Sequence, residues 1–240
     1  MEKSCCFHSR QFYVDGEIHV IKIFTATYKS LQISGNPLFH GITKLVVALS
    51  MGVAPGRRVA VVAHCLLNQN TVVKPLASHV GAVVDLVKAL VEGGYGIVQL
   101  PCPEATYLGM RRWWMSREQY DTASYREHCK RILEATIKLL EELTRDGCEY
   151  IVLGVRGSPS CATTVTTSNP YWSGEPRVDK HPPSAKIERP GVFMEVFFEL
   201  IGARGLKKPL AILDVDHEEV AKRGLPLEVK RVIEEYAPVK

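Results

Sequence analysis

The stretch YIVLGVRGSPSC, residues 150–161, combines the two features that decide how this chain folds. Its first six residues form an apolar run that is typical of a strand buried on both faces of a parallel sheet. Ser158, Pro159, Ser160 and Cys161 follow within a few residues of the strand. Serine and proline favour a tight turn, but a turn does not need a cysteine. The position of Cys161 therefore calls for a chemical explanation.

Strands and helices alternate along the chain from residue 57 onward. Further apolar segments predict buried strands over residues 58–67, which contain Cys65, 95–100 and 209–215. Apolar residues at helical spacing predict helices over residues 75–92, 124–146, 191–204 and 226–236. The first of these would bury Val80, Val83, Val84, Val87, Leu90 and Val91. Because right-handed crossovers make successive strands parallel, we predict an α/β fold with a doubly wound, mainly parallel four-stranded sheet of Rossmann or flavodoxin type.

Two segments lack this regular pattern. Residues 1–56 alternate only around residues 18–24, which predicts a short hairpin in a small N-terminal extension to an α/β domain of residues 57–240. Either the extension packs loosely on the domain, or the natural chain begins at Met51. Residues 165–190 are rich in Pro, Ser and Thr and predict a long surface loop, of the kind that serves as a lid or binding loop.

Composition limits the class of protein. The formal charge of +4 permits an anionic ligand but is too small to indicate binding to a DNA duplex. Seven cysteines, an odd number in a chain of 240 residues, do not form the disulfide framework of a small secreted domain. We therefore expect a cytoplasmic protein. The longest apolar run, residues 45–56, has about half the ~20 residues that a membrane span requires, so we expect no membrane association.

Three of the cysteines, Cys65, Cys102 and Cys161, stand at or just beyond the ends of predicted strands. A parallel sheet brings its strand ends to one edge, so these thiols should meet in one crevice. The chain has no CxxC pair of the kind that structural zinc commonly uses. A soft metal centre with three thiolates and an open position fits better, and iron-sulfur clusters, zinc and Cu(I) all accept thiolates. The alternative is that each is a small buried apolar residue, which is our interpretation of Cys5, Cys6, Cys129 and Cys148.

Three segments resemble the motifs of the thiouracil desulfidase family, in particular its longer branch. They are AHCLLNQN (63–70), LPCPEATYLG (100–109) and RGSPSC (156–161), and the resemblance covers about residues 58–162. In that family three motif cysteines bind a 4Fe-4S cluster, and its fourth iron takes the sulfur of a thiolated pyrimidine. The resemblance implies Cys65, Cys102 and Cys161 as cluster ligands, with Glu104 as the catalytic acid and Ser158 as the assisting serine.

The chain departs from the family pattern at two places. Ala162 follows the third motif where the family usually has glycine, and residues 105–121 are longer than the usual turn. These departures affect the expected substrate more than the expected cluster.

This chemistry is coherent without the resemblance. Sulfur leaves a C=S carbon poorly unless a soft metal binds it, and water must then attack the carbon. Glu104, two residues beyond Cys102, can move the proton of that water. The alternative is that Glu104 is a first-turn or surface carboxylate, and that Ser158 and Ser160 only form the turn around Pro159.

The segment MRRWWMS, residues 110–116, mixes arginine with tryptophan. Such a set can stack a base and hold a phosphate, although tryptophans also pack beneath long loops. The candidate substrate-binding residues are Arg111, Arg112 and Trp113, together with Ser160 and Asn68.

A second acidic segment ends the last predicted strand. Asp214, Asp216 and His217 are candidates for a second metal site, but an aspartate that caps the following helix is the simpler interpretation.

We therefore expect a desulfidase that removes sulfur from a thiolated pyrimidine such as thiouracil with a 4Fe-4S cluster. The alternatives are a non-catalytic iron-sulfur or zinc-binding protein and a zinc hydrolase that uses the same cysteines. The sequence indicates neither the natural substrate nor the oligomeric state.

Overall fold

The chain divides into two compact units, residues 1–54 and 55–240. The structure, a computed structural model, describes residues 8–14, 17–23, 55–174 and 185–238. In the first unit, strand β1 (His8–Val14) pairs antiparallel with β2 (Glu17–Ile23), which confirms the predicted short hairpin. Met51, the alternative start, lies outside the described residues.

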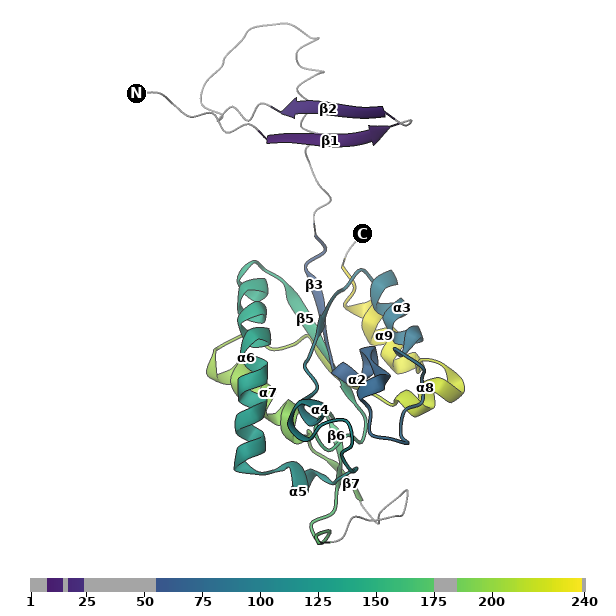
Figure 1. Ribbon diagram of the computed structural model, residues 1–240, viewed down its shortest axis with the longest axis vertical. Coiled ribbons are helices and arrows are strands. Elements are labelled where there is room, and N and C mark those ends of the chain that lie inside the picture. Colours follow the sequence, from purple (N-terminus) through teal and green to yellow (C-terminus); the bar gives the residue numbers. More distant parts are fainter. Residues whose placement is uncertain (1–7, 15–16, 24–54, 175–184, 239–240) are drawn as a thin grey trace, which may run out of the picture. The chain divides into compact units, whose positions relative to one another are not determined.

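The second unit is built on a four-stranded parallel sheet (Figure 1). Its strands are β3 (Arg58–Val62), β4 (Gly96–Gln99), β5 (Glu149–Val155) and β8 (Ala211–Val215), in the order β4-β3-β5-β8. The predicted α/β class and parallel sheet are confirmed. The first strand lies between the second and the third, so the winding direction changes between β3 and β5. Ligands of such sheets bind outside the carboxyl ends of the strands at this switch point.

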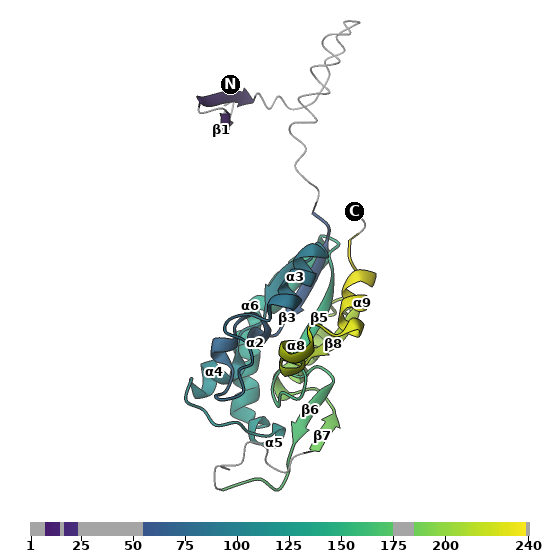
Figure 2. The ribbon, with the colours of Figure 1, turned by 90° about the vertical axis from the view of Figure 1, so that its right-hand side faces the viewer.

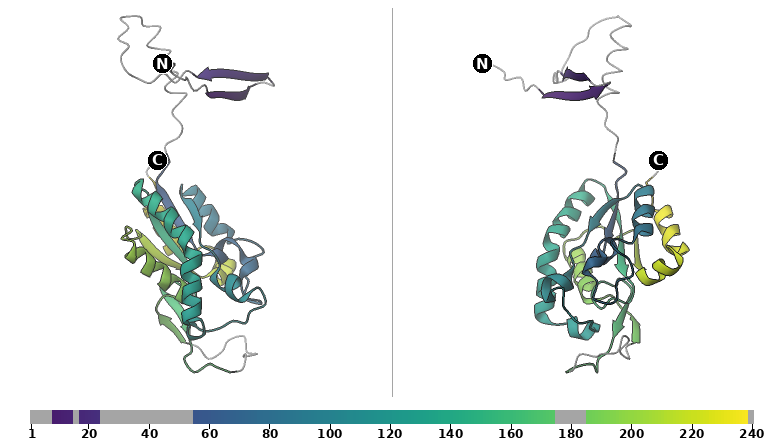
Figure 3. Two further views of the ribbon diagram at one scale, coloured as in Figure 1. Left: turned by 60° about the vertical axis from the view of Figure 1, so that its left-hand side comes forward. Right: turned by 45° about the vertical axis from the view of Figure 1, so that its right-hand side comes forward.

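Helices cover both faces of the sheet, as Figures 1 and 2 show. The elements α6 (Ala123–Arg145) and α7 (Val192–Ala203) lie side by side on one face (Figure 3). The opposite face carries α3 (Val84–Glu92), α8 (His217–Arg223) and α9 (Leu227–Glu235). The middle residues of β3 and β5 are fully buried between these layers, as the apolar runs of the sequence predict. Among the described helices, none is long and apolar enough to cross a membrane.

The strand predicted over residues 58–67 is wrong in its second half. The strand β3 ends at Val62, and a helical turn, α2 (His64–Leu67), follows. Backbone bonds from Leu66 to Ala63 and from Asn68 to His64 close this turn. A short apolar run is buried equally well as strand or helix, so periodicity could not separate the two. Cys65 consequently projects from a helical turn.

The helix predicted over residues 75–92 is also wrong in its first half, because α3 begins only at Val84. The residues before it bond to the segment that contains α2 and the 3-10 turn η1 (Gln69–Thr71): Gln69 N donates to Gly81 O, and Val83 N donates to Leu66 O. These bonds compete with helix formation. Val80, Val84 and Val91, predicted to face inward, are exposed.

Short elements occupy the segments predicted as loops. The loop over residues 165–190 contains an antiparallel hairpin of β6 (Val165–Ser168) and β7 (Ala185–Glu188), and the segment after β4 contains α4 (Pro103–Leu108) and α5 (Arg117–Tyr120). Each is too short to show a period in the sequence. These elements gather beyond the carboxyl ends of the strands (Figure 2).

Candidate active site

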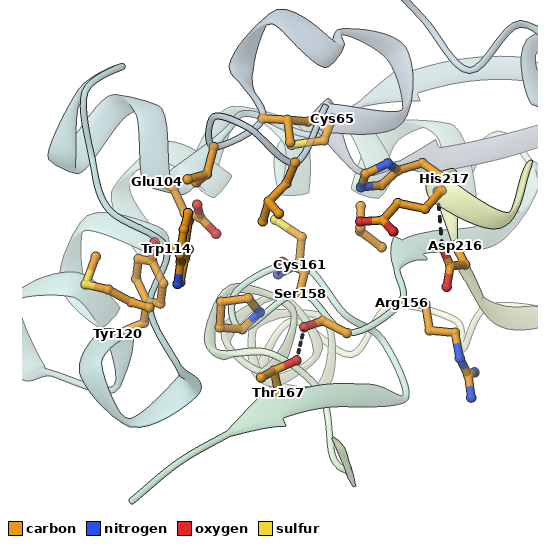
Figure 4. Close-up of a pocket in the computed structure, with 18 of the residues that line it drawn as sticks. Cys65, Glu104, Trp114, Tyr120, Arg156, Ser158, Cys161, Thr167, Asp216 and His217 are labelled. Carbon is orange, nitrogen blue, oxygen red and sulfur yellow. Dashed lines mark hydrogen bonds between the residues drawn. The ribbon is translucent and has the colours of Figure 1, made fainter. Parts of the chain in front are cut away.

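A cavity of about 410 Å³ lies at the carboxyl ends of the strands (Figure 4). We call it the strand-end cavity. Cys65 on α2, Cys102 at the start of α4 and Cys161 after β5 all line it. Three elements far apart in the sequence thus bring three thiols to one space, as the strand-end argument predicts.

Local structure positions each of these thiols. Cys102 is the N-cap residue of α4, and its Sγ accepts a hydrogen bond from Ala105 N at 3.4 Å. The Sγ of Cys65 lies 3.8 Å from Thr71 Oγ1. The Sγ of Cys161 lies 3.4 Å from Ser160 Oγ. Each sulfur therefore has a polar neighbour, and the backbone N–H at Cys102 is a donor that supports a thiolate there.

The three thiols influence one another's protonation. A hydrogen bond from Cys65 is the main reason that the pKa of Cys102 is lowered, and the same bond is the main reason that the pKa of Cys65 is raised. Burial, followed by the charge of Glu104, raises the pKa of Cys161. Deprotonation of three neighbouring, buried thiols costs free energy because their negative charges repel one another. A bound metal cation would neutralise the thiolates.

The spacing of the ligands bears on the kind of centre. Within the described ranges, no three His, Cys, Asp or Glu side chains are close enough together to hold one metal ion. A single tetrahedral ion draws its ligands tightly together. A 4Fe-4S cluster binds each thiolate through a different iron, so its ligands lie further apart. Three cysteines that line one cavity can supply the thiolate ligands of a soft metal centre.

Glu104 is held rigidly in the wall of the strand-end cavity. It is buried, and its Oε2 accepts a hydrogen bond from Arg112 Nε at 2.8 Å. Its Oε1 accepts a hydrogen bond from the fully buried Ser160 hydroxyl. Glu104 is therefore a partnered carboxylate in the first turn of α4, as one half of the alternative had it, but it is buried in the site and not at the surface.

The two serines of the SPSC turn differ in their contacts. Ser158 lines the cavity, and its Oγ accepts a hydrogen bond from Cys161 N at 2.9 Å, so it also forms the turn. Ser160 contacts Glu104 instead. The backbone N–H groups of Val192 and Phe193 in α7 donate to the carbonyls of Pro159 and Ser160, which anchors the turn on this helix.

The structure separates the remaining candidates. Arg112 lines the cavity, but Asn68, Arg111 and Trp113 do not. The side chain of Asn68 accepts a hydrogen bond from Asn70 N, and Trp113 is 65% exposed. Its neighbour Trp114 lines the cavity instead. Adjacent residues of a loop point in different directions, and no periodicity indicated which tryptophan turns inward.

The opposite end of the cavity contains residues that sequence analysis assigned to other roles or did not recognise. Asp216 lines the cavity but caps α8, since Oδ1 accepts hydrogen bonds from Glu218 N and Glu219 N at 3.1 Å. The carboxylate of Asp214 accepts hydrogen bonds from the backbone N–H groups of residues 163–165 and from the hydroxyls of Thr163 and Thr164. Both aspartates therefore act as hydrogen-bond acceptors for the backbone, and Asp216 confirms the simpler interpretation of a helix cap. The lining residues that sequence analysis missed include Tyr120, Trp172 and Lys186.

Comparison with known proteins agrees with this geometry. The family model described as "Putative 2-thiouracil desulfurase" matches residues 57–204, more than half of the chain. An uncharacterised protein of Methanocaldococcus jannaschii, MJ0003, is 46% identical over 106 residues, which are 44% of this chain and 68% of that protein. No solved structure matches the chain significantly. The matched residues include all three cavity cysteines and Glu104, and the chain belongs to the putative 2-thiouracil desulfurase family.

Proposed function

We propose that this protein is a desulfurase that hydrolyses the C=S bond of a thiolated pyrimidine such as thiouracil, with a 4Fe-4S cluster held by Cys65, Cys102 and Cys161. One observation carries the proposal: three thiols and a buried, partnered carboxylate line the same cavity. The reaction consumes water and converts the thiocarbonyl to a carbonyl with release of hydrogen sulfide. It is redox-neutral, so it needs no external electron donor or acceptor.

A 4Fe-4S cluster held by Cys65, Cys102 and Cys161 would supply a soft Lewis acid that accepts the thiocarbonyl sulfur and favours its departure. Every other step belongs to the residues of the chain itself.

Glu104 is placed to take the proton of the attacking water. Each of its oxygens accepts one hydrogen bond from the protein, and a carboxylate oxygen accepts about two, so each retains a free lone pair for water. Arg112 and Ser160 hold the carboxylate in one orientation, which is the positional requirement for general base catalysis. Arg112 forms an ion pair with Glu104 and acts through this carboxylate, so it is a positioning residue.

The alternatives are weaker on physical grounds. A protein that only carries a cluster or stores sulfur has no need for a buried glutamate beside the thiols, because burying a charge costs free energy. A zinc hydrolase with these cysteines would require three ligands around one ion, an arrangement that the described residues do not contain.

Anaerobic purification followed by metal and sulfide analysis tests the cofactor. We expect about four iron and four sulfide per chain, as in a cubane cluster. Serine at Cys65, Cys102 or Cys161 should abolish or damage the cluster. Serine at Cys129 or Cys148, which do not line the cavity, is the matched control and should leave it intact. Stoichiometric zinc without acid-labile sulfide would contradict the cluster.

Sulfide release from 2-thiouracil and 4-thiouracil tests the reaction. Protein with a complete cluster should release one sulfide for each uracil that it forms. A complete cluster with no release from any thiolated base would favour the non-catalytic alternative.

A further inference from the structure

Two hydrogen-bond donors in the strand-end cavity make no hydrogen bond of ordinary geometry to any residue that the structure describes. In the described part of the chain, three buried polar side-chain atoms are without a partner: Trp114 Nε1 and the hydroxyls of Tyr120 and Tyr125. Trp114 and Tyr120 line the cavity, whereas Tyr125 does not. A buried donor without a partner costs about 1–3 kcal/mol. Two such donors in the wall of one cavity indicate that a ligand supplies the acceptor.

Packing fixes the Tyr120 ring. Tyr120 is 2% exposed, and its ring lies 5.0 Å from that of Tyr125, centroid to centroid, at an interplanar angle of 47°. Arg117, at the other end of the same short helix, forms buried ion pairs with Asp121 and Glu195. The hydroxyl is thus held in place before any ligand binds, which lowers the entropic cost of recognition.

The surroundings of these donors indicate the charge of the acceptor. Figure 4 shows Glu104, Trp114 and Tyr120 grouped on one side of the cavity, with Arg156, Asp216 and His217 on the opposite side. Burial and then the negative charge of Glu104 raise the pKa of Tyr120, so its hydroxyl remains protonated and can donate. The hydroxyl makes no hydrogen bond of ordinary geometry with that carboxylate. Glu104 and Arg112 neutralise each other, so this pair leaves no free cation for an anionic ligand group, and a neutral acceptor fits the two neutral donors.

We propose that Tyr120 Oη–H and Trp114 Nε1–H recognise a neutral ring carbonyl of the substrate. This inference rests on the proposed function. It narrows the substrate class to thiolated heterocycles that carry a carbonyl oxygen in addition to the C=S group. Sites built to hydrogen-bond such a group reject analogues that lack it, because their own donors are then left buried and unpaired.

Binding of uracil, which contains no sulfur, tests the inference without turnover. Isothermal titration calorimetry should give about tenfold weaker binding for Tyr120→Phe, which corresponds to one lost hydrogen bond. Tyr125→Phe removes an equally buried, unpartnered hydroxyl outside the cavity and should bind uracil like the wild type. Neither variant should unfold at a lower temperature, because neither hydroxyl forms a hydrogen bond of ordinary geometry with the described residues. A clearly lower melting temperature for Tyr120→Phe would show that the protein itself supplies a partner for this hydroxyl, and would overturn the inference. Uracil binding by Tyr120→Phe that equals that of the wild type would also overturn it, as would a wild type that does not bind uracil.

Discrimination between two substrates gives a second, independent readout. Pyrimidine-2-thione has the same C=S group as 2-thiouracil but lacks its ring carbonyl. The wild type should have a lower KM for 2-thiouracil, and Tyr120→Phe should reduce this preference about tenfold, with Trp114→Phe acting in the same direction. Equal preference in wild type and Tyr120→Phe contradicts the inference while the desulfurase proposal stands. If no thiolated base reacts but uracil binding still depends on Tyr120, the desulfurase proposal fails and the recognition site stands.

Discussion

Arg112 and Glu104 form an ion pair whose side chains are only 2% and 10% exposed, with Arg112 Nε 2.8 Å from Glu104 Oε2. Arg112 also donates to the carbonyl of Thr71 at 2.6 Å. This single side chain therefore ties the carboxylate beside Cys102 to the segment that follows Cys65.

Replacing Arg112 tests the pair. Arg112→Gln leaves the Glu104 charge buried without its cation, and we expect the free energy of unfolding in urea to fall by about 3–5 kcal/mol. Arg111→Gln is the matched control, because Arg111 is exposed and a surface substitution changes stability by about 0.5 kcal/mol or less. Equal losses in the two variants would contradict a structural ion pair at position 112.

Glu104→Gln tests the proton transfer. The amide has nearly the same shape but cannot take a proton from water, so sulfide release should fall by about 10²–10⁴-fold. Iron and sulfide content should remain that of the wild type, since the side chain binds no iron in the proposed site. Ser158→Ala, which also lines the cavity, should keep the cluster with a smaller loss. A Glu104→Gln variant as fast as the wild type would remove Glu104 from the reaction.

Gly191→Ala tests how the SPSC turn is seated. A Cβ on Gly191 would lie 2.5 Å from the carbonyl carbon of Ser160 and 2.9 Å from that of Pro159, both backbone atoms. The turn or helix α7 must then shift, at a cost of about 1–3 kcal/mol, and the cluster should assemble poorly. Gly202→Ala in the same helix meets nothing within 4 Å and should leave cluster content unchanged. Normal cluster content in Gly191→Ala would show that the turn tolerates displacement.

Glu195 supports a prediction about pH. Burial alone would raise its pKa, but hydrogen bonds from Arg189 and Arg126 and the charge of Arg117 outweigh burial, and the pKa is lowered. Glu195 therefore contributes stability above its unfolded pKa of about 4.3, and this contribution disappears as the pH falls through the lower folded pKa.

Urea unfolding of Glu195→Gln between pH 7 and pH 3 measures this contribution. At pH 7 the variant should be less stable than the wild type by about 1–3 kcal/mol, and the difference should shrink as the pH falls below about 4. Glu199→Gln is the control, because that side chain is more exposed and lies 3.4 Å from Arg126. A difference that stays constant with pH would mean that the ion pairs of Glu195 do not stabilise the fold.

The sequence by itself determined the sheet and the convergence of the cysteines. The segment 150–155 is apolar at every position because β5 is buried on both faces, and that pattern needs no knowledge of neighbouring elements. Once strands and helices alternate, right-handed crossovers bring Cys65, Cys102 and Cys161 to one edge. The long helix α6 was predicted to within a residue at each end, because its apolar stripe repeats over many turns.

Only the tertiary structure decided which polar side chains meet. Ser160 rather than Ser158 bonds to Glu104, Trp114 rather than Trp113 lines the cavity, and Arg112 pairs with Glu104. Likewise, Val80 is exposed because the backbone of residues 81–83 bonds to the turn after β3. A periodic pattern in the sequence shows which face of a helix or strand is buried. Contacts between loops depend on distances set by the packed sheet, and these have no local pattern in the sequence.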